Sequence, residues 1–347
     1  MRIAIATVQV PFLRGGAEML AEGLRRALRN AGHEAEIVAI PFKWYPAPSI
    51  AQQLLACRLL DLSESMGTRI DRVVGLKFPA YLIPHPDKVL WLLHQHRSAY
   101  DLWESSFDDL SAQPGGTEAR EIIRSADSRL IPEARRVFTI SRNVADRLQH
   151  FCGIDGEPLY HPPPLAEGFH AGAYSDYLLM PSRVNEVKRQ GLVVEAMLRT
   201  RHPVRVVFIG AADHPAYLAA VQKRAQGLAS GRITWLGEVS NDRKIALLSD
   251  CLGVLVPPFD EDYGYVTLEA MLSARAVITC TDSGGPLEFV QHGRNGLVSE
   301  PDAAALAEAM DALWEDRVRA RRMGQEGRAF YTELDPSLEH VVECLLA

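Results

Sequence analysis

The segment Leu252–Cys280, LGVLVPPFDEDYGYVTLEAMLSARAVITC, contains the pattern that decides the fold. A short apolar run ends at Pro257 and Pro258, an apolar helical pattern starts near Tyr265, and a second β-branched run ends at Cys280. Short, nearly continuous apolar runs are typical of parallel strands that are covered by helices on both faces. The segment therefore predicts a strand–helix–strand unit of a parallel α/β sheet.

The same alternation of strands and helices fills two stretches of the chain. Between them, residues 153–176 (GIDGEPLYHPPPLAEGFHAGAYSD) are rich in proline and glycine and lack a helical period, which predicts an interdomain linker. We expect an α/β protein with two Rossmann-like, doubly wound parallel-sheet domains facing a cleft, in residues 1–168 and 169–330, with ligands at the carboxyl ends of the strands. Whether a helix in residues 331–347 returns to the first domain stays open.

Composition and charge limit the class of protein. The chain has 347 residues, 47% of them hydrophobic and 23% charged, which is typical of a globular protein with two domains. A net charge of −7 argues against a surface that binds nucleic acid, so we expect no nucleic-acid partner. Five dispersed cysteines indicate reduced thiols and a cytoplasmic location. No signal peptide or spanning segment is expected, while peripheral contact with the inner face of a membrane stays open.

Two glutamates and a glycine turn follow the first strand of the opening segment. Glu261 precedes the helix and Glu269 lies within it, eight positions later, so both can face one cleft. The amides of Gly264, Tyr265 and Val266 open the helix and can bind a phosphate or sugar oxygen. A carboxylate can accept hydrogen bonds from both hydroxyls of a ribose. The alternatives are a structural role for Glu269 and a Mg²⁺ or Mn²⁺ site in the acidic cluster.

Charged or glycine-rich loops follow other predicted strands. Arg183 and Lys188 can bind a diphosphate as a planar fork and a point charge, or can belong to an ordinary solvated helix start. His94 ends a strand of the first domain, where it can transfer protons or make a structural hydrogen bond. Gly16, in PFLRGGAEM, can let the backbone approach an anion, or can simply form a turn.

Together these features resemble the retaining nucleotide-sugar glycosyltransferases of the GT-B fold, in the large E-x7-E family (glycosyltransferase family 4-like). The resemblance covers nearly the whole chain and is strongest in residues 177–302. Residues 260–298, DEDYGYVTLEAMLSARAVITCTDSGGPLEFVQHGRNGLV, are similar to the family's E-x7-E segment with its glycine pair, glutamate and NGLV strand. The resemblance implies a first domain on the acceptor side and a second domain that binds the donor.

The resemblance also implies roles for individual residues. Glu269 would hold the donor ribose and Glu261 would lie beside the donor sugar, while the two cations would stabilise the leaving diphosphate. The implied catalytic residues are Arg183, Lys188, Glu261 and His94. The implied donor-binding residues are Gly16, Gly210, Gly264, Tyr265, Val266 and Glu269.

The implied enzyme is a hexosyltransferase (EC 2.4) that transfers a sugar with retained configuration and needs neither a metal nor another cofactor. The expected donor is a nucleotide-diphosphate sugar, most readily a UDP- or GDP-sugar. The expected acceptor is a carbohydrate or lipid-linked hydroxyl, in the biosynthesis of a bacterial-type surface polysaccharide, glycolipid or related glycoconjugate. Two other classes were weighed: a nucleotide-sugar-binding protein without turnover, and an NAD(P)-dependent oxidoreductase, against which the missing GxGxxG motif argues.

Three features depart from the family pattern. Residues 160–168, YHPPPLAEG, replace the usual segment after the last strand of the first domain, which puts the contacts there in doubt. Lys188 is followed by Arg189 and Gln190, where the family has a glycine directly after the lysine. The turn MLSARAV at residues 271–277 lacks a common glycine. None of the three removes a candidate catalytic group.

Overall fold

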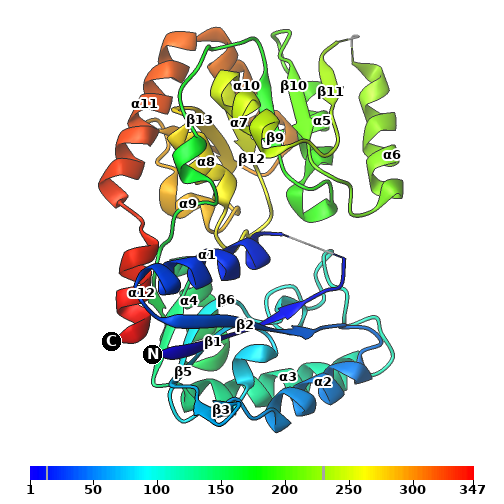
Figure 1. Cartoon of the computed structure of the whole chain (residues 1–347). Helices are drawn as coiled ribbons and strands as arrows, with labels where there is room; N and C mark the ends of the chain where they lie inside the picture. The colour runs from blue at the N-terminus through cyan, green and yellow to red at the C-terminus, as the bar shows by residue number, and fades with distance from the viewer. Residues whose placement is uncertain (13–14, 229–230) are drawn as a thin grey trace. The chain divides into compact units, whose positions relative to one another are not determined.

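The computed structural model describes residues 1–12, 15–228 and 231–347, which form two compact units (Figure 1). The first unit comprises Met1–Pro164 and Pro336–Ala347, and the second comprises Leu165–Asp335. The second unit thus starts earlier than the expected boundary at residue 169 and ends later than residue 330. Its end is later because helix α11, Arg317–Leu334, continues without a break to the edge of the unit.

The first unit is built on a parallel sheet in the order β2-β1-β5-β6-β7-β8. Its strands are β1 (Arg2–Gln9), β2 (Glu34–Pro41), β5 (Arg72–Lys77), β6 (Lys88–His94), β7 (Arg136–Thr139) and β8 (Glu157–Pro158), beside a small hairpin of β3 (Glu64–Ser65) and β4 (Thr68–Arg69). Its helices are α1 (Gly16–Asn30), α2 (Pro48–Leu59), α3 (Gly116–Leu130), α4 (Arg142–Cys152) and α12 (Leu338–Leu346). Figure 1 shows α1 and α12 on one face of this sheet and α2 and α3 on the other.

The C-terminal helix α12 packs on α1 within the first unit. A Cβ placed on Gly23 of α1 would lie 3.4 Å from Cδ1 of Leu338. Arg72, which is buried in β5, donates a hydrogen bond of 2.8 Å to the Leu345 carbonyl oxygen. The last twelve residues of the chain, from Pro336, are therefore part of the first unit and not of the second.

The segment expected to be a linker contains one strand that sequence patterns did not predict. Strand β8 pairs with β7 in parallel, with Phe138 opposite Glu157. A strand of two residues has no periodicity, so it gives no signal of its own in the sequence. The irregular connection between the two sheets therefore begins only after Pro158.

The second unit has its own parallel sheet, in the order β11-β10-β9-β12-β13-β14. Its strands are β9 (Leu178–Pro181), β10 (Val206–Ile209), β11 (Ile233–Trp235), β12 (Gly253–Val256), β13 (Ala276–Cys280) and β14 (Gly296–Ser299). Its helices are α5 (Gln190–Met197), α6 (Pro215–Arg224), α7 (Asn241–Asp250), α8 (Tyr265–Leu272), α9 (Pro286–Phe289), α10 (Ala303–Glu315) and α11. The opening segment forms β12, α8 and β13, as the sequence predicts.

The strand order of the second unit reverses at β9. The chain adds β10 and β11 on one side of β9 and then crosses to place β12, β13 and β14 on the other. Gly253 of β12 pairs with Leu178 of β9. In doubly wound folds, ligands bind outside the carboxyl ends of the strands at such a point.

Across the part of the chain that the structure describes, no helix combines the length and the apolar composition needed to span a membrane.

Candidate functional site

The loops that follow β9 and β12 bring Lys188 and Glu261 together. Lys188 is the last residue of a short 3-10 turn, Glu186–Lys188, and its N–H donates a hydrogen bond of 3.0 Å to the side-chain oxygen of Asn185, which caps the turn. The Lys188 ammonium makes a close ion pair with Oε2 of Glu261. Both side chains are about three-quarters buried, with exposed fractions of 22% and 24%. The strand reversal therefore places a cation and a carboxylate, 73 residues apart in sequence, at one point.

A third loop, after β13, holds the backbone around Glu261. The Glu261 N–H donates to the Ser283 carbonyl at 3.0 Å, and the Gly285 N–H donates back to the Glu261 carbonyl at 2.7 Å. A Cβ on Gly285 would lie 2.7 Å from the Tyr263 carbonyl oxygen, so only glycine fits there. The glycine pair of the SGGP turn therefore permits close packing of two loops against each other.

Gly264 starts helix α8 in a left-handed conformation, with φ of 86°. A Cβ there would also approach Cγ of Pro286 to 2.9 Å, so a larger residue would be both strained and crowded. Tyr265 and Val266 are the first two residues of α8, where helix amides lack intrahelical acceptors and the helix dipole favours an anion. The expected helix start is confirmed at this residue.

Glu269 is buried in α8, with 3% of its surface exposed. Its Oε1 accepts a hydrogen bond of 2.6 Å from Nζ of Lys244 in α7, while its Oε2 has no partner among the described residues. The hydroxyl of Thr267, two residues earlier, is also buried without a described partner. Burial raises the pKa of the nearby Tyr265 phenol, and the negative charge of Glu269 raises it further. Lys244 thus neutralises the carboxylate through one oxygen, and the other oxygen has no hydrogen-bond donor among the described residues.

Lys244 is a functional candidate that sequence patterns did not identify. A buried glutamate indicates that a partner exists, and the expected structural alternative for Glu269 is therefore met in part by this ion pair. The partner lies 25 residues away on another helix, and the lysine sits in an ordinary amphipathic pattern, NDRKIALLSD. Nothing in that pattern distinguishes Lys244 from a solvated surface lysine.

Arg183 has a different carboxylate partner from Lys188. Its guanidinium pairs with Asp213, on the loop after β10, at 3.1 Å, and the side chain is 58% exposed. Asn185 donates a second hydrogen bond, of 2.7 Å, to the same Asp213 carboxylate. The binding of one diphosphate by both cations stays a prediction.

Gly210 directly follows β10 and has a backbone conformation that suits glycine, with φ of 130°. A Cβ at this position would lie 2.1 Å from the Ser182 carbonyl oxygen, because the loops after β9 and β10 touch there. Close packing is a sufficient structural reason for this glycine, and its contact with a donor stays a prediction.

Two further predicted residues belong to the first unit. His94 is the last residue of β6, and its Nδ1 lies 2.5 Å from the Gln95 carbonyl oxygen. Gly16 is the first residue of α1, and the amide of its neighbour Gly15 donates to the Glu18 carboxylate at 2.7 Å. Gly15 has extended backbone, and the contact of Gly16 with a donor stays a prediction. The neighbouring residues 13 and 14 lie outside the described part.

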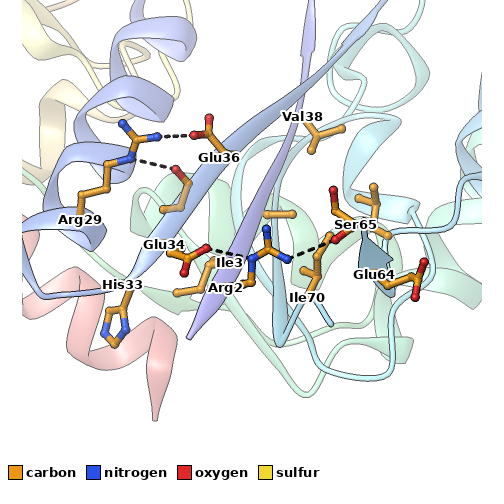
Figure 2. Close-up of a pocket in the computed structure, with 13 residues that line it drawn as sticks. Arg2, Ile3, Arg29, His33, Glu34, Glu36, Val38, Glu64, Ser65 and Ile70 are labelled. Atoms are coloured by element: carbon orange, nitrogen blue, oxygen red, sulfur yellow. Dashed lines mark hydrogen bonds and ion pairs between the residues drawn. The ribbon is translucent and has the colours of Figure 1, made fainter. Parts of the chain in front are cut away.

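The first unit also contains a cavity at the amino ends of β1 and β2, with a mainly apolar lining that includes several charged side chains (Figure 2). Arg2 pairs there with Glu34 at 2.9 Å and donates to the Ser65 carbonyl, while Arg29 pairs with Glu36. Figure 2 shows these charged groups turned toward one another. The cavity lies at the amino ends of the strands, whereas ligands of doubly wound folds bind outside the carboxyl ends, so it is not comparable with the site in the second unit.

The chain is similar in sequence to glycosyltransferases. Residues 173–330 match the family described as Glycosyl transferases group 1. The chain is 31% identical over 166 residues to the alpha-1,3/1,6-mannosyltransferase ALG2 of Homo sapiens, which covers 44% of this chain and 40% of that protein. It is 29% identical over 251 residues to the D-inositol 3-phosphate glycosyltransferase of Nocardia farcinica, which covers 66% and 54%. The matched part is thus about half of each relative's length.

Solved structures match the fold of the whole chain. Sucrose-phosphate synthase from Thermosynechococcus elongatus superimposes with a TM-score of 0.76 over 99% of this chain and 98% of its own, at 16% identity. Anabaena HepE in complex with UDP-glucose gives a TM-score of 0.73 over 99% and 98%, at 15% identity. The expected fold class, two Rossmann-like domains of the GT-B type, is confirmed.

Proposed function

We propose that the chain transfers a sugar from a nucleotide-diphosphate sugar to a hydroxyl acceptor, in the biosynthesis of a glycoconjugate. The observation that carries this proposal is the site at the strand reversal of the second unit. There Lys188 pairs with Glu261, and the buried Glu269 keeps one carboxylate oxygen without a described partner. All three lie inside the segment that matches Glycosyl transferases group 1.

The geometry supports a separate role for each part of the donor. Oε2 of Glu269 can accept hydrogen bonds from the ribose hydroxyls, since Lys244 already neutralises the other oxygen. The amides of Tyr265 and Val266 can bind a phosphate or sugar oxygen at the start of α8. The donor is a UDP- or GDP-sugar; the solved structure of HepE, which has the same fold, contains UDP-glucose.

Lys188 supplies the charge that the reaction needs. As the bond to the sugar breaks, negative charge develops on the leaving diphosphate, and a fixed ammonium stabilises it more in the transition state than in the ground state. The paired Glu261 carboxylate keeps that ammonium in place until the donor arrives, and then lies beside the sugar. Arg183, with its side chain 58% exposed, can leave Asp213 and bind the outer phosphate.

We further propose that the sugar is transferred with retained configuration. We also propose that no metal is needed, because Lys188 and Arg183 provide two positive charges for the diphosphate. The acceptor is a carbohydrate or lipid-linked hydroxyl. Gly16 and His94 in the first unit are the proposed contacts on the acceptor side. Peripheral contact with a membrane surface would serve a lipid-linked acceptor.

The first test identifies the donor. UDP, GDP, ADP, CDP and TDP are each added to the purified chain, and the melting temperature is measured. A nucleotide at about 100 times its Kd stabilises the folded chain by about 2.7 kcal/mol, which is a shift of several degrees. The matching nucleotide sugars are then supplied with carbohydrate and lipid-linked acceptors, and NMR of the product shows the anomeric configuration.

The second test removes the proposed site. The Glu269→Ala/Lys188→Ala double variant should lose nearly all transfer while keeping its fold. Glu308→Ala, which removes an exposed glutamate on α10, is the matched control and should keep full activity. Full transfer by the double variant would overturn the assignment. Nucleotide binding with neither donor hydrolysis nor transfer would instead identify a binding protein without turnover.

A further inference from the structure

Arg189 follows Lys188 directly and adopts a backbone conformation that L side chains rarely accept. Its φ and ψ are 61° and 39°, in the left-handed region, where a Cβ crowds the following carbonyl and glycine does not. Strained residues of this kind persist where the surroundings hold them, and they occur often at functional sites. The arginine therefore needs an interaction that offsets its backbone strain.

The guanidinium of Arg189 makes such an interaction with the loop after β13. It forms a two-pronged ion pair with Asp282, with Nη1–Oδ1 and Nη2–Oδ2 distances of 2.7 and 2.6 Å. The two side chains are only 16% and 31% exposed. The guanidinium also lies 5.2 Å from the centre of the Phe259 ring. Paired forks of this type are the strongest and most directional ion pairs in proteins.

These contacts connect three loops that carry the proposed donor site. Arg189 comes from the loop after β9, Phe259 from the loop after β12, and Asp282 from the loop after β13. The Phe259 N–H donates to the Val187 carbonyl at 2.8 Å, and the Asp260 N–H donates to the Asp282 carbonyl at 2.8 Å. Asp282 therefore binds Arg189, next to Lys188, through its side chain. It binds Asp260, next to Glu261, through its backbone.

We propose that the Arg189–Asp282 ion pair positions Lys188 for its contact with the carboxylate on the neighbouring loop. The pair touches neither donor nor acceptor in this role, and acts through the lysine and Glu261. A displaced ammonium would still attract the diphosphate but would stabilise the leaving group less well, because that effect depends on distance and direction. The kinetic part of this inference rests on the proposed function, whereas the placement of Lys188 does not.

The kinetic test uses Arg189→Gly, Asp282→Asn and the double variant. Each single variant should lower kcat about 10-fold and leave the donor KM within about twofold, because a misplaced group costs more in the transition state than in binding. The double variant should lose no more than either single variant, since both remove one interaction. An unchanged kcat in both single variants would overturn the proposal. A loss of about 100-fold in the double variant would also overturn it, because the two effects would then be independent.

Stability distinguishes positioning from a simple structural role. Arg189→Gly removes the backbone strain as well as the ion pair, so its melting temperature should equal or exceed that of Arg189→Ala. Its kcat should nevertheless be lower than that of the parent chain, because the ion pair with Asp282 is lost. Asp335→Gly is the matched control, because Asp335 is an exposed left-handed residue, with φ of 43°, at the end of α11. It should keep the normal kcat. A kcat that followed the melting temperature across these variants would contradict positioning.

A third measurement needs neither donor nor acceptor. Lysine acetylation with a limiting reagent is followed by mass spectrometry, with the exposed Lys223 as the internal reference. Loss of the contact with Glu261 should raise the relative labelling of Lys188 about threefold or more in Arg189→Gly, because the side chain, 22% exposed in the ion pair, becomes more accessible to the reagent. An unchanged rate would overturn the proposal even if transfer is established. A raised rate would support it even if the proposed function fails.

Discussion

Nζ of Lys244 lies 2.6 Å from Oε1 of Glu269, and this single ion pair divides the carboxylate into one neutralised oxygen and one that faces no described donor. The pair joins α7 to α8, on two different βα units of the second sheet. Glu269 can therefore be both a structural partner and a ligand-binding group. The structural role and the ribose-binding role of Glu269 therefore do not exclude each other.

Removing only the lysine should destabilise the second unit. In Lys244→Met the Glu269 carboxylate would stay buried without its counter-charge, at a cost of about 1–3 kcal/mol after allowance for the partial exposure of the lysine, 29%. The melting temperature should fall by several degrees. Lys244→Met/Glu269→Met removes both charges and should recover most of that loss. A double variant as unstable as the single one would show that the lysine acts through packing.

The free oxygen of Glu269 should determine the preference for ribose. Hydrogen bonds to a charged acceptor contribute about 1.5–3 kcal/mol each, so the chain should bind the matching nucleoside diphosphate about 10-fold or more tightly than its 2′-deoxy form. In Glu269→Gln this difference should shrink to about threefold or less. Titration calorimetry with both nucleotides measures the ratio. An equal preference in the parent and the variant would place the ribose elsewhere.

Lys188 should act mainly on the chemical step. Lys188→Ala should lower kcat by about 10²–10³, the usual cost of losing a charge aimed at a developing anion, with a smaller rise in the donor KM. Lys188→Arg retains the charge but not the geometry, so its kcat should lie between those of the parent chain and Lys188→Ala. Single-turnover rates with a radiolabelled donor separate chemistry from product release. Equal losses in kcat for both variants would mean that position alone, and not charge, matters.

Metal removal should leave the reaction intact. If Lys188 and Arg183 neutralise the diphosphate, then dialysis against EDTA should change kcat by less than about twofold. The same assay with added Mg²⁺ or Mn²⁺ is the control. Loss of transfer with EDTA and recovery with a divalent ion would return the acidic cluster around Glu261 to the metal-site hypothesis.

The pH dependence of stability should depend on Asp127 in the first unit. Burial raises the pKa of this fully buried carboxyl, and although hydrogen bonds from Tyr100, Tyr81 and Gln95 lower it, the net pKa is about 6. Its ordinary pKa is about 3.9, so between about pH 4 and pH 6 the folded form binds more protons than the unfolded form. The contribution of Asp127 is therefore lost as pH rises through this window, by up to about 3 kcal/mol.

A buried histidine and a partly buried one in the same unit have the opposite effect. Burial lowers the pKa of His96 to about 4 and that of His161 to about 3, so their contributions are lost as pH falls below about 6.5. The comparison of Asp127→Asn with the parent chain isolates the aspartate. The melting temperature of the variant, relative to the parent, should rise from pH 4 to pH 7. A difference that stays constant across this range would contradict the raised pKa.

Periodic apolar runs were sufficient to predict most of the fold. The strand–helix–strand order of Leu252–Cys280, the two sheets and the helix start after Gly264 follow from local patterns. Strand β8 was missed because two residues cannot show a period. Two expected glycines are absent: Arg189 directly follows the lysine, where the resemblance implies a glycine, and Ala274 lies in the turn that lacks a common glycine. Both adopt the left-handed conformation, with φ of 61° and 54°.

Local sequence likewise predicts only part of the candidate site. Local sequence is sufficient for the identity and spacing of Glu261 and Glu269, since a turn and a helix start are built by neighbouring residues. The partners of those carboxylates, Lys188 and Lys244, are 73 and 25 residues away, and the contacts exist because parallel strands bring distant loops to one edge of a sheet. No local pattern encodes that meeting, so which lysine neutralises which glutamate became visible only in the folded chain.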